Sequence, residues 1–107
     1  MKWLIVLFLA FSNFLAFGNG DPISKTTVVS GIVIDQHSSE SLTGVRVSVV
    51  GTDIFTFSDR DGNFILDQVP TGNIELSFQL VSFKPEVKNL NTTEVNNSTL
   101  LINLIER

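Results

Sequence analysis

The feature that most constrains this chain is a series of short segments in which apolar and polar residues alternate. From Thr26 onward apolar residues recur at about every second position, turn residues interrupt them at short intervals, and no segment repeats apolar residues at helical spacing. In the clearest segment, 74–80, the apolar side chains share one face and Glu75, Ser77 and Gln79 share the other. Residues 45–49 repeat this pattern. The sequence therefore predicts an all-β chain.

Seven segments of this kind are predicted to be strands, at about 27–34, 45–49, 54–58, 63–67, 74–80, 84–90 and 99–105. Each has one apolar face, and strands this short bury such faces by stacking two sheets or by closing into a barrel. We predict a seven-stranded antiparallel β-sandwich whose core includes Ile74, Leu76, Phe78 and Leu80.

The expected turns have physical causes. Asp61-Gly62 lies between two apolar segments, where glycine can adopt the positive φ of a tight hairpin. Residues 69–72, Val-Pro-Thr-Gly, are typical of a type I turn. Pro85 cannot donate a backbone hydrogen bond, so the strand that it begins is expected at the edge of a sheet.

Residues 1–20 are predicted to be a secretory signal peptide, which leaves 21–107 as the folded domain. Lys2 precedes an apolar run from Trp3 to Phe11, and small residues near Gly18 suggest cleavage before Asn19 or Asp21. A membrane anchor is the alternative, but the apolar region is interrupted and falls short of the roughly 20 residues that a bilayer requires. Without cysteine there is no lipoprotein anchor.

Composition and charge exclude several functions. The chain has no Cys and one His, which excludes disulfides and Cys/His metal cages. Without Lys2, the 7 Lys and Arg become 6 against 11 Asp and Glu, a net charge near −5. Because the remaining cations are scattered singly along the sequence, no partner is expected among nucleic acids or anionic lipids.

Four segments, 31–35, 42–52, 58–64 and 69–72, together resemble the carboxypeptidase regulatory-like domain. The resemblance covers about 28–90 and implies a transthyretin-like (prealbumin-like) or Ig-like sandwich. In Bacteroidetes such domains precede the plug of TonB-dependent outer-membrane receptors, and related domains follow the catalytic domain of zinc carboxypeptidases. In neither place is the domain known for chemistry. Departures from the family pattern occur at Phe55-Thr56 and at Ser82-Phe83.

Two motifs could hold a metal, and we predict that neither does. His37 and Glu40 have the spacing of zinc ligands, but no second His is available as a further ligand. Asp59, Asp61 and Asn63 resemble the start of a calcium loop, which then lacks its glycine and its bidentate glutamate.

Related sandwiches that carry chemistry have signatures that this chain lacks. Urate-pathway hydrolases of the transthyretin fold end in Tyr-Arg-Gly-Ser, whereas this chain has no Tyr and ends in 104–107, Leu-Ile-Glu-Arg. An isopeptide bond would need Lys and an acid at about the places of Val33 and Phe78. We therefore predict no catalytic residue, no cofactor and no internal cross-link.

Exposed phenylalanines could mark a binding face. Phe57, Phe64 and Phe78 are predicted to point into the core, which leaves Phe55 and Phe83 as candidate surface anchors. The Asn-rich segment 89–99 contains N-glycosylation sequons at Asn91, Asn96 and Asn97, which we interpret as ordinary polar loop residues.

These observations predict a non-enzymatic exported module in the periplasm or at the outer membrane, which binds an envelope protein or a glycan or has a structural role. The alternatives are a remnant or N-terminal fragment of a TonB-dependent receptor, and a transthyretin-like small-ligand carrier or hydrolase. A plug and barrel encoded just downstream would favour the fragment, and a polar-lined groove at a dimer interface would favour the carrier.

Overall fold

A computed structural model describes residues 25–93 and 99–107, and every regular element in them is a strand. The strands are β1 (Thr26–Asp35), β2 (Arg46–Val49), β3 (Phe55–Phe57), β4 (Asn63–Pro70), β5 (Asn73–Gln79), β6 (Glu86–Asn91) and β7 (Leu100–Leu104). All seven coincide with segments predicted from the alternating pattern. The predicted signal peptide and the sequons at Asn96 and Asn97 lie outside the described residues.

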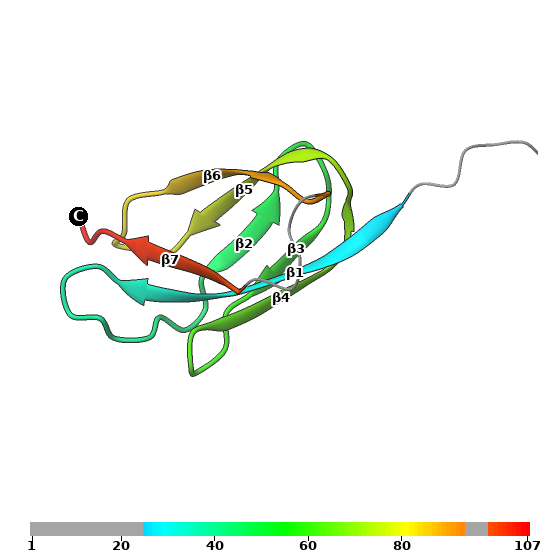
Figure 1. Cartoon of the computed structure of the whole chain (residues 1–107). Helices are drawn as coiled ribbons and strands as arrows, with labels where there is room; N and C mark the ends of the chain where they lie inside the picture. The colour runs from blue at the N-terminus through cyan, green and yellow to red at the C-terminus, as the bar shows by residue number, and fades with distance from the viewer. Residues whose placement is uncertain (1–24, 94–98) are drawn as a thin grey trace, which may run out of the picture.

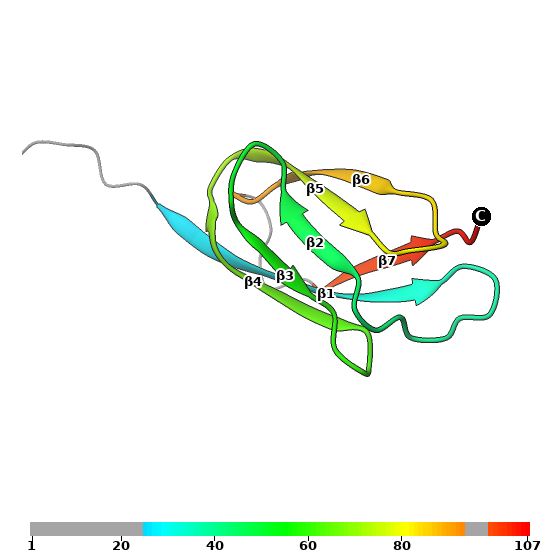
Figure 2. The same cartoon turned by 180° about the vertical axis from the view of Figure 1, so that it is seen from behind.

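The strands form two sheets that pack face to face, as the two opposite views in Figures 1 and 2 show. One sheet has the order β3-β2-β5-β6 and the other β4-β1-β7. Neighbouring strands are antiparallel except β1 and β7, which are parallel. The parallel pair arises because the chain leaves β6 in the four-stranded sheet and crosses to the other sheet before it forms β7. The predicted sandwich is confirmed, with this one parallel pairing.

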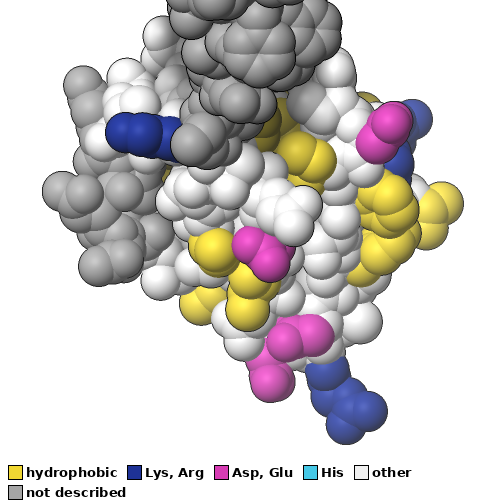
Figure 3. Space-filling view, turned by 90° about the vertical axis from the view of Figure 1, so that its right-hand side faces the viewer, with side chains coloured by type: hydrophobic (Ala, Val, Ile, Leu, Met, Phe, Trp, Pro, Cys, Tyr) yellow, Lys and Arg dark blue, Asp and Glu magenta, His cyan; other side chains and the backbone are white. Residues whose placement is uncertain are grey.

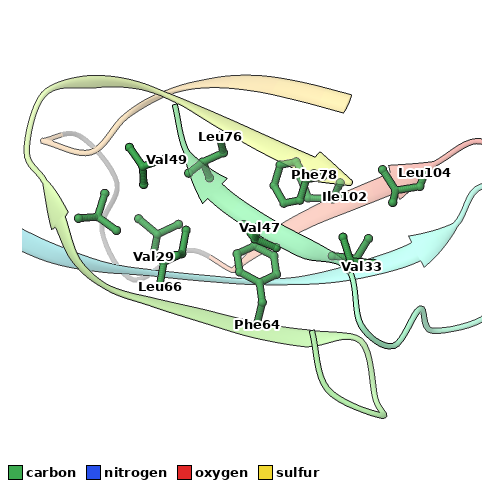
Figure 4. Packing of buried hydrophobic residues seen from close by; sticks show 12 residues of the cluster. Val29, Val33, Val47, Val49, Phe64, Leu66, Leu76, Phe78, Ile102 and Leu104 are labelled. Carbon is green, nitrogen blue, oxygen red and sulfur yellow. The ribbon is translucent and has the colours of Figure 1, made fainter. Parts of the chain in front are cut away.

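The core lies between the two sheets and consists of aliphatic and aromatic side chains (Figure 4). Phe64 of β4 and Phe78 of β5 meet across it edge to face, with ring centroids 5.7 Å apart. In β5, Leu76 and Phe78 are fully buried, whereas Glu75 and Gln79 are exposed, as predicted. The fully buried side chains are Phe64, Phe78, Leu66, Leu76, Leu104, Val33, Val45, Val47 and Val69.

Gly31 allows three strands to approach one another. A Cβ atom at this position would lie 2.6 Å from the Leu100 carbonyl oxygen of β7 and 2.7 Å from the Phe64 ring of β4. Since no real Cβ sits so close to backbone, only glycine fits at this crossing of β4, β1 and β7.

β4 is longer than predicted because a bulge extends it. Val29 of β1 pairs with Leu66, but Thr27 pairs with Val69, so β4 has one extra residue between these pairs. Gln68 lies in this bulge and has a positive φ of 59°. The bulge returns Val69 to the core, where it is fully buried. The sequence pattern breaks at Asp67, which is why the predicted strand ended there.

The positive φ predicted at Gly62 and the edge position predicted for the strand after Pro85 are confirmed, but the two turns differ from the prediction. β3 and β4 belong to different sheets, so Asp61-Gly62 turns the chain from one sheet to the other and closes no hairpin. Val69 and Pro70 are part of β4, so the second turn consists of Thr71 and Gly72 and not of 69–72. Gly62 and Gly72 have positive φ values of 78° and 121°, after β3 and β4 respectively. Pro85 directly precedes β6, an edge strand of the four-stranded sheet. Among the described residues no helix is long and apolar enough to cross a membrane.

Candidate functional site

The outer face of the three-stranded sheet is aliphatic. Val28, Ile65 and Leu101 are 56%, 64% and 60% exposed, and Ile32 and Ile34 are half-buried beside them. Ile32 pairs directly with Leu101, and Ile65 lies on the other side of β1, opposite Ser30. We call these five residues, Val28, Ile32, Ile34, Ile65 and Leu101, the aliphatic face. A contiguous exposed surface of this kind is typical of a site that another protein covers.

The outer face of the four-stranded sheet is mostly polar, with one aromatic corner. The polar part comes from Arg46 and Ser48 of β2 and from alternate residues of β5. At the corner, the Arg46 guanidinium carbon lies 4.7 Å from the centre of the Phe55 ring. Phe55 also packs edge to face against Phe57, at 5.7 Å between centroids.

The prediction that Phe57 points into the core is wrong. Phe57 is 54% exposed and Phe55 is 50% exposed, while Thr56 between them pairs with the buried Val47. The cause is Ser58, whose buried hydroxyl accepts a hydrogen bond from the Val45 N–H at 2.9 Å and donates one to the Leu42 carbonyl at 2.6 Å. Because residues 56 and 58 are held inward, residues 55 and 57 must face outward.

Phe55 is exposed, as predicted, but Phe83 is not the exposed surface anchor that the sequence predicted. Phe83 is half-buried against the core and pairs with Glu106. Hydrogen bonds from Lys84 N–H to the Ile105 carbonyl and from Arg107 N–H to the Ser82 carbonyl hold the two segments together. Phe83 therefore closes one end of the sandwich instead of offering a contact.

The structure does not gather the candidate metal ligands into a site. The Asp35 carboxylate, before His37, accepts hydrogen bonds from the backbone N–H groups of His37 and Ser38 and so shapes the loop. In 25–93 and 99–107 no group of three or more His, Asp or Glu side chains is placed to hold a metal ion.

The calcium-like motif is a turn closed by its first residue. One oxygen of Asp59 accepts hydrogen bonds from the N–H groups of Asp61 and Asn63, both at 2.9 Å. The carboxylate thus closes the turn that leads from β3 to β4, which lie in different sheets. Val33 and Phe78, considered above for an isopeptide bond, are both fully buried in the apolar core.

Sequence reasoning missed two buried hydroxyls, Ser58 and Thr92. The Thr92 hydroxyl donates to the Pro70 carbonyl and accepts from the Gly72 N–H, each at 2.9 Å, and so ties the β4–β5 turn to the end of β6. Both residues lie in polar stretches of sequence, where nothing distinguishes a buried Ser or Thr from an exposed one.

Two grooves flank β6. The larger, about 610 Å³, is lined by amides such as Asn73, Asn89 and Asn91 and by Glu75 over apolar residues. The other, about 490 Å³, lies between β6 and β7 and is lined by Gln36, Glu86, Val87, Lys88, Asn89, Leu101, Ile102 and Asn103. On the face seen in Figure 3, cationic and anionic side chains are interspersed and hydrophobic side chains form separate patches.

Comparison with known proteins assigns the fold and a family model. Residues 29–107 match the model of the CarboxypepD_reg-like domain. Two crystal structures of type II cohesin–X-dockerin interface mutants from Acetivibrio cellulolyticus contain similar chains. The first match has 20% identity and a TM-score of 0.56, and covers 73% of this chain and 56% of that one. The second has 18% identity and a TM-score of 0.54, with 75% and 58% covered.

At these identities the structural likeness establishes the fold alone, and the aligned region spans little more than half of each matched chain. No curated protein gives a significant match to the sequence.

Proposed function

The chain belongs to the CarboxypepD_reg-like domain family, and from that premise we propose that it is an exported, non-catalytic module that binds a protein partner in the bacterial cell envelope. The observation that carries the proposal is the aliphatic face. This face exposes Val28, Ile65 and Leu101 to water, and the free energy falls when another protein surface covers them.

The chemistry of this face favours a protein over a glycan. Sugars are bound through hydrogen bonds to hydroxyl groups and through stacking on flat rings, whereas the five side chains of the aliphatic face are aliphatic only. The interfaces that such surfaces form are apolar at the centre and polar at the rim. Here Asn63 and Asn103, both exposed, supply the polar rim on β4 and β7.

Export is the second part of the proposal. We propose that residues 1–20 are removed and that the domain acts in the periplasm or at the outer membrane, in a bacterium of the Bacteroidetes type that uses TonB-dependent receptors. The apolar segment after Lys2 supports this. Intact-mass measurement of the protein from the envelope fraction should give an N-terminus near Asn19 or Asp21, and a retained Met1 would contradict export by cleavage.

Site-specific photo-crosslinking in cells tests the partner. A photoreactive residue replacing Ile65 should give a discrete cross-linked product of higher mass in the envelope fraction. The matched control places the same residue at Phe57, which is similarly exposed but lies on the other sheet. Equal products from both positions, or none from position 65, would refute docking through the aliphatic face.

A receptor fragment is the alternative role, in which the aliphatic face packs against the next domain of a longer protein. The nucleotide sequence downstream distinguishes the two. A plug and barrel encoded in another reading frame, together with no cross-linked partner, would favour the fragment.

A further inference from the structure

The two sheets have four edge strands, and three of them carry features that prevent pairing with another chain. β3 has only three residues. β4 has the bulge at Gln68 and ends in Pro70. β6 follows Pro85, and its Glu86 and Lys88 pair with Phe78 and Leu76, so both charges lie on the core-facing side of this edge. Short length, bulges, proline and inward charges are the devices by which natural sheets block their edges.

β7 has none of these devices. Its five residues, Leu-Leu-Ile-Asn-Leu, carry no charge and no proline, and they show no irregularity in their register with β1. The strand borders the 490 Å³ groove that separates it from β6, and both strands are edges of their sheets (Figure 1). Among the described residues β7 is thus the edge best suited to accept another strand.

Backbone directions identify the groups that would bind. The Leu104 carbonyl accepts from Gln36 N–H at the end of β1, so the backbone groups of Leu104 point toward β1. The Ile105 carbonyl accepts from Lys84 N–H on the opposite side. Since backbone groups alternate along a strand, the N–H and C=O of Leu101 and Asn103 point away from β1, toward the open edge.

The open part of this edge is limited at its carboxyl end. Residues 105–107 are paired with 82–84, so a new strand can reach only Leu100–Leu104. The centre of this window is Ile102, and Leu101 and Asn103 lie symmetrically on either side of it. Two copies of one strand that pair antiparallel are related by a two-fold axis, which for this window would pass beside Ile102.

We propose that β7 pairs antiparallel with β7 of a second copy of this chain, with the two-fold axis passing beside Ile102. Leu101 of each copy then lies opposite Asn103 of the other, and the two residues exchange N–H···O=C hydrogen bonds. The two three-stranded sheets become one continuous sheet, and the aliphatic faces of the copies join across the axis. The proposal does not depend on the partner protein proposed above.

Charge supports a second copy as the occupant. β7 brings no like charges together, because it has none. Glu86 and Lys88 both line the groove beside Leu101, Ile102 and Asn103, on either side of Val87. An antiparallel two-fold arrangement reverses their order in the second copy, so that Glu86 of one copy approaches Lys88 of the other.

The first experiment needs no variant. Amide hydrogen exchange of the exported protein is measured by NMR at increasing protein concentration, alongside sedimentation velocity. We expect a dimer, and we expect the amides of Leu101 and Asn103 to become protected as it forms. A monomer at all concentrations, or a dimer in which these two amides still exchange freely, would overturn the proposal. The second of these outcomes would indicate association through the aliphatic face instead.

A matched pair of variants gives the second experiment. Asn103→Pro removes an N–H that points toward the open edge, and so leaves the hydrogen bonds between β7 and β1 in place, whereas Asn103→Ala keeps that N–H. We expect the first to weaken the dimer roughly tenfold or more and the second to change it little. Equal dimerisation of the two variants would contradict strand pairing, and the exchange measurement decides the matter if Asn103→Pro fails to fold.

Ile65→Thr, on the far strand β4, should dimerise normally even where it loses the partner protein.

Discussion

The outer faces of the two sheets differ although their inner faces are alike. Both inner faces are packed with Val, Leu and Phe and form one core. Outside, the three-stranded sheet exposes the aliphatic face, while the four-stranded sheet exposes hydroxyls, amides and charges with Phe55, Phe57 and Arg46 at its corner. Since folding depends mainly on the inner faces, each outer face is free to acquire its own chemistry.

The same comparison shows that an exposed aromatic pair and an exposed aliphatic sheet are different kinds of surface. The rings of Phe55 and Phe57 pack on each other, and Arg46 covers one of them, so part of their surface is already satisfied within the chain. Ile65 and Leu101 are only slightly more exposed than Phe57, but they belong to a set of five aliphatic side chains that extends over all three strands of their sheet. This difference is the reason that we place the partner on the three-stranded sheet.

The largest expected effect comes from breaking the shared core on which the comparison rests. Phe78→Ala should lower the free energy of unfolding by roughly 3–5 kcal/mol, because it leaves a cavity beside Phe64. Gln79→Ala, one residue along and exposed, should change it by less than about 0.5 kcal/mol. Urea denaturation measures both, and equal costs would mean that the register of β5 is wrong.

A smaller effect is expected at the residue that turns the aromatic corner outward. Ser58→Ala should cost roughly 1–3 kcal/mol, because it leaves the Val45 N–H without its buried partner. Ser48→Ala, on the outer side of β2, is the matched control and should cost less than about 0.5 kcal/mol. A cost for Ser58→Ala no larger than the control would show that the hydroxyl does not fix the inward side of β3.

The aromatic corner itself should contribute less. A double-mutant cycle of Arg46→Ala and Phe55→Ala should give a coupling of about 0.5–1 kcal/mol, the usual size of a cation–π contact at an exposed site. Thermal or urea denaturation of the four proteins in the cycle gives the value. No measurable coupling would indicate that Arg46 leaves the ring in solution and that the corner is open to ligands.

The smallest stability effect is expected on the aliphatic face. Ile65→Thr keeps a β-branched residue at an exposed position, so it should change the free energy of unfolding by less than about 0.5 kcal/mol while it weakens the proposed partner contact. Leu66→Ala, its buried neighbour, should cost roughly 2–5 kcal/mol. If Ile65→Thr destabilises the isolated domain as much, the face is part of the fold and not a docking surface.

Much of the fold could be predicted because alternation, turn residues and strand length are local properties of sequence. The seven strands, the outward side of β5, the glycine turns and the edge position of β6 all followed from them. The candidate binding surface could not be predicted in the same way. Phe57 was predicted in the core because it alternates with polar neighbours, although those neighbours, Thr56 and Ser58, are the residues that face inward. The aliphatic face was not recognised because its residues lie on strands far apart in sequence.

The sequence by itself determined the period of each strand, and therefore which residues share a face, because side chains alternate along any extended chain. It did not determine which of the two faces is buried in β3, since three residues carry too little pattern. That choice was made by the Ser58 hydroxyl, which bonds to Val45 and Leu42, 13 and 16 residues away. The parallel pairing of β7 with β1, and with it the open edge, was likewise decided only in the folded chain, because it joins Gly31 to Leu100 across nearly the whole domain.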